Sequence, residues 1–126
     1  MDAIRIVLAD DNDEFRTELV DYLNKQSGLA VVAGADNGLE AVYLAHAHQP
    51  DVVLLDISMP GMSGLEAARQ IKEYSSRIKI VFVTIHEEKT YHSLAHVIGV
   101  DGFVSKSNLK KDLLVLLQKF QPTQLH

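Results

Sequence analysis

Five short runs of aliphatic and β-branched residues alternate along the sequence with segments long enough to form amphipathic helices. The apolar runs lie at 4–9, 29–35, 52–55, 79–84 and 102–104, and the expected helices at about 13–26, 38–47, 64–73, 87–98 and 108–120. Such alternation implies a parallel sheet covered by helices on both faces, with right-handed crossovers. We therefore expect an α/β fold, a flavodoxin-like (βα)5 three-layer sandwich, and five strands favour the sheet order 2-1-3-4-5.

Local signals mark several of the helix ends. Gly28 suits the left-handed position after the first helix, and Gly99 ends the fourth. Ser63 and Glu66 form a capping box that begins the third helix. The apolar face of the first helix is predicted to carry Phe15, Leu19, Tyr22 and Leu23.

Composition limits the class of protein. The 126 residues suit one domain, and we expect it to span 1–121, with 122–126 as a tail or the start of a linker. A net charge of −5 argues against nonspecific binding of nucleic acid or membrane by this domain. The absence of cysteine excludes disulfides and thiolate metal sites. Since no apolar run approaches the roughly 20 residues of a membrane span and no signal peptide is evident, we expect a cytoplasmic protein.

Polar residues follow four of the expected strands. Asp10 and Asp11 follow the first, Asp56 the third, Thr84 ends the fourth, and Lys106 comes just after the fifth. Each alone would be ordinary turn or capping chemistry. Together they are predicted to meet at one edge, because ligand sites of open α/β sheets lie at the carboxyl ends of the strands.

The charges of this set predict a metal site. Two carboxylates about 4 Å apart repel by about 4 kcal/mol at an effective dielectric near 20. Three carboxylates and one ammonium leave two negative charges, which a divalent cation would neutralise. Oxygen ligands favour Mg²⁺, or Mn²⁺, and Mg²⁺ readily accepts a phosphate oxygen. Lys106 and the Thr84 hydroxyl could then bind other phosphate oxygens, which leaves one Asp as a nucleophile.

These residues resemble the receiver domain of two-component response regulators over essentially the whole chain. The matching positions are Asp10, Asp11, Asp56-Ile57-Ser58-Met59-Pro60 with Gly64, Thr84 and Lys106. The resemblance implies that Asp56 accepts a phosphoryl group from a sensor histidine kinase. It also implies that Asp11 binds Mg²⁺ directly, with Asp56 and the Ile57 carbonyl as further ligands and Asp10 acting through water. Thr84 would bond the phosphoryl group, and Phe103 stands where the family carries its switch aromatic.

The segment "GVDGFVSKSN" further resembles the NarL/FixJ class, which usually carries a helix-turn-helix output domain. The resemblance implies a transcription regulator that contacts DNA only through an output domain absent from this chain, so we expect a fragment of a longer protein. It also implies a homodimer surface built from 87–98, 102–104 and 108–120. Beyond self-phosphorylation and self-dephosphorylation, no enzymatic turnover is expected.

Three alternatives stay open. The first is a stand-alone receiver that acts by protein contacts. The second is a metal-dependent phosphatase with an aspartyl nucleophile, although "DDNDEF" does not match the D-x-D-x-T pattern of such enzymes. The third is a flavodoxin-type cofactor carrier, whose first loop must accept a phosphate that Asp10, Asp11 and Asp13 would repel.

Some positions depart from the family pattern or carry a second interpretation. Ser107 replaces the proline that commonly follows the lysine. Ser58, Ile85 and His86 border the expected phosphoryl site and are predicted to tune access and rate. Ile85 replaces a commonly small residue, so it either narrows the approach to Asp56 or points into the core.

Two helices add minor signals. His92 and His96 have a zinc-compatible spacing but no third ligand is evident. Leu114 and Val115 fall outside the apolar stripe of the last helix and suit either a wide buried face or a partner surface.

Overall fold

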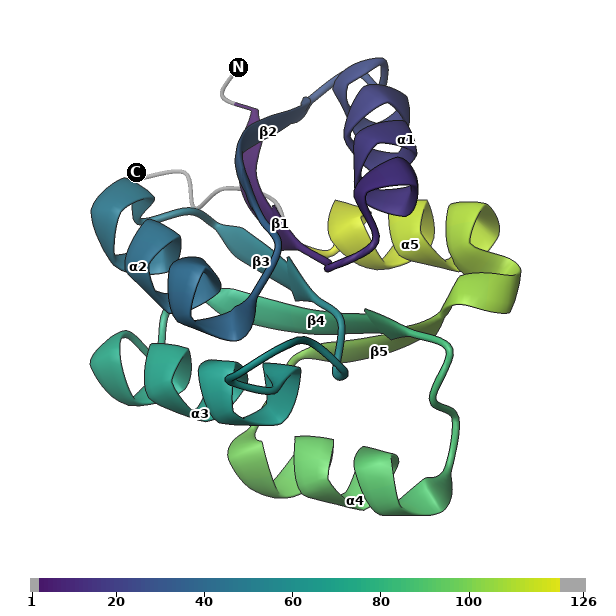
Figure 1. Ribbon diagram of the computed structural model, residues 1–126. Helices are drawn as coiled ribbons and strands as arrows, with labels where there is room; N and C mark the ends of the chain where they lie inside the picture. Colours follow the sequence, from purple (N-terminus) through teal and green to yellow (C-terminus); the bar gives the residue numbers. More distant parts are fainter. Residues whose placement is uncertain (1–2, 121–126) are drawn as a thin grey trace.

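The computed structural model describes residues 3–120 and contains one parallel sheet of five strands (Figure 1). The strands are β1 (Ile4–Ala9), β2 (Leu29–Ala35), β3 (Val52–Leu55), β4 (Lys79–Thr84) and β5 (Gly102–Ser105). Their order is β2-β1-β3-β4-β5, which confirms the predicted flavodoxin-like topology. The order reverses at β1, so the ends of β1 and β3 lie side by side at the topological switch point.

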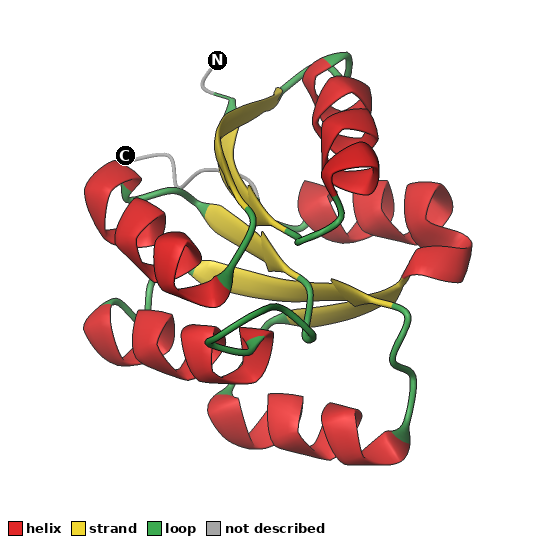
Figure 2. Ribbon diagram, in the orientation of Figure 1, coloured by secondary structure: helices red, strands yellow, loops and turns green. Residues whose placement is uncertain are grey.

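Five α-helices cover the two faces of the sheet (Figure 2). They are α1 (Asp13–Asn24), α2 (Gly38–His48), α3 (Gly64–Tyr74), α4 (Lys89–Ile98) and α5 (Leu109–Gln118), and a 3₁₀ helix η1 (Lys106–Asn108) precedes α5. Helices α1 and α5 bury leucines against one face, while α2, α3 and α4 bury mainly alanines against the other. No helix among residues 3–120 is both long and apolar enough to cross a membrane.

Strand β3 shows why its sequence is an unbroken apolar run. Val52 and Leu54 pack in the core under α1 and α5, whereas Val53 and Leu55 pack in the core on the opposite face. All four side chains are fully buried. A strand with no solvent-facing side needs no polar alternation, and it places the next residue, Asp56, at the edge of a rigid layer.

Several helix limits differ from the predictions by one or two residues. Helix α1 ends at Asn24, two residues early, and the Asn24 side chain accepts a hydrogen bond from the Val31 amide on β2 (2.8 Å). Helix α4 begins at Lys89 because Glu88 has extended backbone angles and no side-chain cap. Helix α5 begins at Leu109, after η1. The predicted tail at 122–126 lies outside the described residues.

The apolar stripe of α5 packs as predicted, with Leu113 and Leu117 buried. Leu114, predicted to lie outside the stripe, is half-buried against the same core. Val115 is 56 % exposed. The wide-face interpretation therefore suits Leu114, and Val115 remains on the surface.

Candidate functional site

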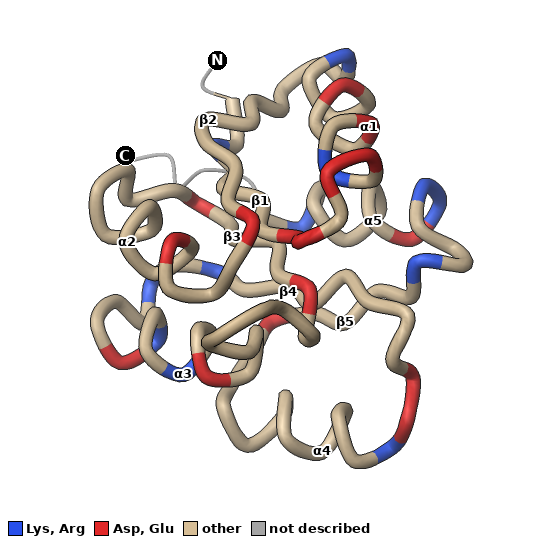
Figure 3. Tube along the Cα trace, in the orientation of Figure 1, with Lys and Arg blue, Asp and Glu red and all other residues tan. Residues whose placement is uncertain are grey.

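Three acidic residues lie where β1 and β3 end (Figure 3). Asp10 and Asp11 follow β1, Asp56 follows β3, and one oxygen of each lies within 4.8 Å of the others. Asp10 and Asp56 are buried, at 1 % and 6 % exposure, whereas Asp11 is exposed. Within residues 3–120, this is the one group of three acidic or metal-binding side chains close enough to share an ion.

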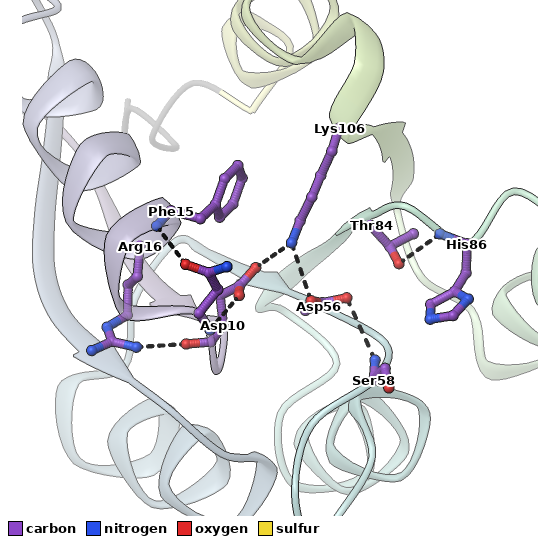
Figure 4. A network of polar contacts seen from close by, with 9 residues as sticks. Asp10, Phe15, Arg16, Asp56, Ser58, Thr84, His86 and Lys106 are labelled. Atoms are coloured by element: carbon purple, nitrogen blue, oxygen red, sulfur yellow. Dashed lines mark hydrogen bonds and ion pairs between the residues drawn. The ribbon is translucent and has the colours of Figure 1, made fainter.

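Lys106 reaches into this cluster from the end of the edge strand β5 (Figure 4). It is the first residue of η1, directly after β5. Its Nζ lies 2.8 Å from Asp10 Oδ2 and 3.2 Å from Asp56 Oδ2. The predicted meeting of strand-end side chains is therefore present for both carboxylates and the amine.

The pocket is more acidic than one ammonium can balance. Burial raises the pKa of Asp10, and the nearby Asp56 charge adds to that rise, although hydrogen bonds from Lys106 and the Asn12 amide partly oppose it. For Lys106, burial works against the charged form, but the hydrogen bonds and attraction of Asp10 and Asp56 outweigh it and raise the pKa. Another cation would therefore stabilise ionised Asp10.

The loop between β1 and α1 is held by contacts that the sequence analysis missed. The Asn12 amide donates to Asp10 Oδ1 (2.9 Å), and the Asn12 side chain caps α1 by accepting from the Phe15 amide (2.9 Å). Arg16 donates to the Asp10 backbone carbonyl (2.6 Å) and pairs with Asp13. Asn12 could have been identified as an N-cap from its residue type, whereas no sequence pattern predicts the reach of Arg16.

The segment after Asp56 is packed tightly against α3. The Gly64 amide donates to the Ile57 carbonyl at 2.7 Å. A Cβ on Gly64 would overlap the Asp56 backbone carbonyl, so α3 can approach this closely only with glycine at its first position. A carbonyl oxygen has two lone pairs, so Ile57 retains one for a further partner. The Ser58 amide faces Asp56 Oδ1 at 3.4 Å, a long hydrogen bond.

Thr84 is fully buried at the end of β4, and its hydroxyl accepts from the His86 amide at 3.1 Å. The His86 ring lies 5.2 Å from the Tyr91 ring, centroid to centroid, and its Nδ1 is 3.8 Å from Glu88 Oε2. The hydrogen bond of the buried Thr84 hydroxyl is therefore with the backbone of the loop that follows β4. Figure 4 shows Thr84 and Asp56 at the same edge of the sheet.

Two positions next to the site face outward. Ile85 is 70 % exposed, so the interpretation of Ile85 as a core residue is wrong: the run of buried side chains on β4 ends with Thr84, and the next side chain faces solvent. Ser58 is also exposed. At Ser107 the amide donates to Ser105 Oγ (3.2 Å), a bond that proline could not make.

Phe103 on β5 is half-buried between two rings. It meets Phe82 edge-on, with centroids 6.0 Å apart, and stacks on His92 of α4 at 3.8 Å and an interplanar angle of 24°. His92 is therefore part of the surface covering Phe103. This stack connects β5 with α4 beside the carboxyl edge of the sheet.

The chain is similar to known proteins along most of its length. Residues 6–118 match the family model described as the response regulator receiver domain. The response regulator GacA of Pseudomonas viridiflava is 40 % identical over 103 residues, 82 % of this chain and 48 % of that protein. The response regulator protein VraR of Staphylococcus aureus is 34 % identical over 118 residues, 92 % of this chain and 56 % of that protein. The chain thus spans about half the length of the curated relatives it matches.

Solved structures agree with this assignment. The signal receiver domain of the response regulator NarL from Mycobacterium tuberculosis has a TM-score of 0.89 and 31 % identity, and the match covers 98 % of this chain and 100 % of that one. A DNA-binding response regulator of the LuxR family from Staphylococcus aureus has a TM-score of 0.88 and 32 % identity, covering 94 % and 99 %. With its acidic cluster at the sheet's switch point, this chain belongs to the receiver-domain family of two-component response regulators.

Proposed function

We propose that the chain accepts a phosphoryl group on Asp56 from a sensor histidine kinase and thereby switches its α4-β5-α5 face. The observation that carries this proposal is the position of Asp56. It is a buried carboxylate at the end of the central strand β3, and it shares its pocket with two further carboxylates and the ammonium of Lys106.

In the proposed step, an Asp56 oxygen attacks the phosphorus of a phosphohistidine. An O–P bond forms, the N–P bond breaks, and its electron pair remains on the imidazole nitrogen of the kinase. Lys106, already 3.2 Å from Asp56 Oδ2, would pair with one phosphoryl oxygen, and the Thr84 hydroxyl would donate to another. Hydrolysis of the acyl phosphate by water would reset Asp56.

The donors of this pocket suit Mg²⁺ or Mn²⁺, since all are oxygen atoms and their charge exceeds that of Lys106. Asp11, which is exposed, would meet the ion directly, with Asp10, Asp56 and the remaining lone pair of the Ile57 carbonyl as further ligands. When bound, the ion supplies charge neutralisation and a coordination position for a phosphoryl oxygen.

The proposed switch starts from the contacts of Thr84 and Phe103. Drawing the Thr84 hydroxyl toward the phosphoryl group would break its bond from the His86 amide. The space that Thr84 leaves would then admit Phe103, which would leave its stack on His92. Phosphorylation shifts this equilibrium only through contacts that differ between the two states.

The face that would respond has apolar side chains exposed on α4 and α5. Leu94, Val97 and Val115 are 41 %, 81 % and 56 % exposed. From Tyr91 to Ile98, α4 carries no Lys, Arg, Asp or Glu (Figure 3). Exposed apolar clusters often mark interfaces, and this one supports a homodimer or an output contact.

For the whole protein, we propose a cytoplasmic transcription regulator whose output domain binds DNA. GacA and VraR are about twice as long as the matched segment, and one structural relative is described as DNA-binding. The reading frame beyond His126 decides between this arrangement and a stand-alone receiver.

The direct test is labelling of Asp56. Wild-type protein with Mg²⁺ and acetyl phosphate or phosphoramidate is expected to gain one phosphoryl group by mass spectrometry, and Asp56→Asn none. Asp36→Asn is the matched control, because Asp36 also follows a strand, β2, but lies outside the acidic cluster. Wild-type labelling that persists in Asp56→Asn would refute the assignment, and catalytic turnover of phosphate esters would favour the phosphatase alternative.

A further inference from the structure

The ammonium of Lys106 has a third neighbour besides the two carboxylates. Its Nζ lies over the ring of Phe15, 4.1 Å from the ring centroid. The Lys106 side chain is only 17 % exposed. An ammonium has three N–H groups. Asp10 and Asp56 each accept one hydrogen bond, and the ring face covers another approach to the same nitrogen (Figure 4).

Phe15 is held in place by the loop that carries the acidic pair. Its amide donates to the Asn12 side chain, and the Asn12 amide donates to Asp10 Oδ1, both at 2.9 Å. The ring also packs at the border of the core beneath α1 and α5. The ring and the Asp10 carboxylate are therefore fixed to the same short segment, and both contact the Lys106 ammonium.

We propose that Phe15 is a positioning residue for Lys106: its ring face keeps the ammonium above Asp10 and Asp56 and excludes water from it. The face of an aromatic ring attracts a cation through its quadrupole. Unlike a carboxylate, the ring adds this attraction without offering an oxygen ligand to a metal ion. Lys106 would thus keep one fixed neighbour when an Asp56 oxygen is taken up in an acyl phosphate, a consequence that rests on the proposed function.

The first experiment compares Phe15→Leu with Phe15→Tyr. Phe15→Leu keeps an apolar side chain but removes the ring, and we expect labelling of Asp56 by acetyl phosphate to slow by about threefold to tenfold, the factor that corresponds to a partly desolvated cation–π contact. Phe15→Tyr is expected to restore the rate to within about twofold of wild type, because it keeps the ring face.

Tyr22, on the same helix α1 as Phe15, provides a matched control. Lys110 of α5 stands over the Tyr22 ring of α1, with Nζ 5.1 Å from the centroid. Tyr22→Leu removes the same kind of contact between the same two regions, away from the acidic cluster. We expect Tyr22→Leu to leave the labelling rate unchanged. Equal slowing by Tyr22→Leu and Phe15→Leu would overturn the proposal, since both would then act through general packing.

A double-mutant cycle separates positioning from packing. In a Lys106→Met background, Phe15→Leu should slow labelling no further. The same four proteins are also unfolded in urea, and the unfolding equilibrium constant of each is measured. The effect of Phe15→Leu on that constant should differ by about threefold or more between the wild-type and the Lys106→Met background. Additive effects in the urea cycle would overturn the proposal. That cycle needs no phosphorylation, so it still decides the role of Phe15 if wild-type protein is never labelled and the proposed function fails.

Discussion

Asp10 and Asp11 are adjacent in the chain but have opposite surroundings. Asp10 is buried and bound by Lys106, the Asn12 amide and, through its backbone carbonyl, Arg16. Asp11 is exposed at the pocket mouth. The first carboxylate therefore belongs to the pocket's internal hydrogen-bond network, and the second is the one most accessible to an ion from solvent.

Asp11→Asn is predicted to weaken Mg²⁺ binding by about tenfold or more, because it removes one charged ligand. The fold should stay intact, because the change removes repulsion between like charges. Calorimetric titration with Mg²⁺ measures the affinity, and urea unfolding measures the stability. Asp13→Asn is the control, since Asp13 is an exposed neighbour that pairs with Arg16 outside the cluster. An unchanged Mg²⁺ titration in Asp11→Asn would rule out its ligand role.

Ile85→Ala is predicted to speed both phosphorylation by small donors and loss of the phosphoryl group, by up to about tenfold if the side chain adds about 1.4 kcal/mol to the approach. Ile85 is 70 % exposed, so the free energy of unfolding should change by no more than about 0.5 kcal/mol. Stopped-flow labelling and urea unfolding check the two parts. Val97→Ala, at a more exposed site on α4, is the control; equal rates in all three proteins would end the gating hypothesis.

At the scale of single residues, the sequence predicted which side chains meet but not all that surrounds them. Asp10, Asp56 and Lys106 could be placed because parallel strands end at one edge. Phe15 was predicted only as part of an apolar helix face, since periodicity does not show that a ring on the border of the core faces a cation. The direction of Ile85 was undecided because strand alternation gives no information beyond the last paired residue, Thr84.

At the scale of elements, α3 begins with a side-chain cap and a group of charged side chains in contact. The Ser63 hydroxyl accepts from the Glu66 amide at 3.2 Å, which confirms half of the predicted capping box. The Glu66 carboxylate turns instead to Arg69 and Gln70. Hydrogen bonds from Arg69 and then Gln70 lower the pKa of Glu66 to about 2.

This gives a pH prediction with a definite sign. A carboxyl group whose pKa is lower in the folded state contributes stability above its unfolded pKa, and that contribution is lost as pH falls through the folded pKa. The Glu66 contribution should therefore be intact above about pH 4.5 and lost on acidification toward about pH 2. An NMR titration of the Glu66 carboxyl carbon checks the midpoint. Arg69→Met should return it toward the ordinary value, and an ordinary midpoint in wild-type protein would contradict the prediction.

Element limits were predicted well where the chain carries a cap and less well elsewhere. The starts of α1, α2 and α3 were correct, and each has an Asn or Ser whose side chain accepts from the backbone three residues on. The starts that shifted are those of α4 and α5, whose first turns have no side-chain cap. In the turn before α5, the Ser105 hydroxyl accepts a hydrogen bond from the Ser107 amide. Hydrophobic periodicity does not reveal such a side-chain bond, so it could not predict where α5 begins.

At the scale of the whole molecule, phosphorylation is predicted to change one face and not the other. When Asp56 is phosphorylated, the amide chemical shifts of Thr84 and of residues along β5 and α4 should change, because Phe103 and His92 are stacked there. The α2–α3 side should stay unchanged. His92→Ala, which removes the outer partner of Phe103, should enlarge the fraction of inward Phe103 before phosphorylation. Shifts confined to the acidic cluster would contradict transmission through Phe103.

The sheet order also determines where the two described ends of the chain emerge. All strands are parallel, so β1 begins at the edge opposite the acidic cluster, and α5 runs back from that cluster toward the same opposite edge (Figure 1). A tether, fluorophore or fused domain attached at either end would therefore lie at the edge of the sheet opposite the acidic cluster. It would leave Asp56 open to a phosphodonor. Immobilising the protein through both ends at once would hold it with the acidic pocket facing solution, the orientation that a surface-based kinase-binding assay requires.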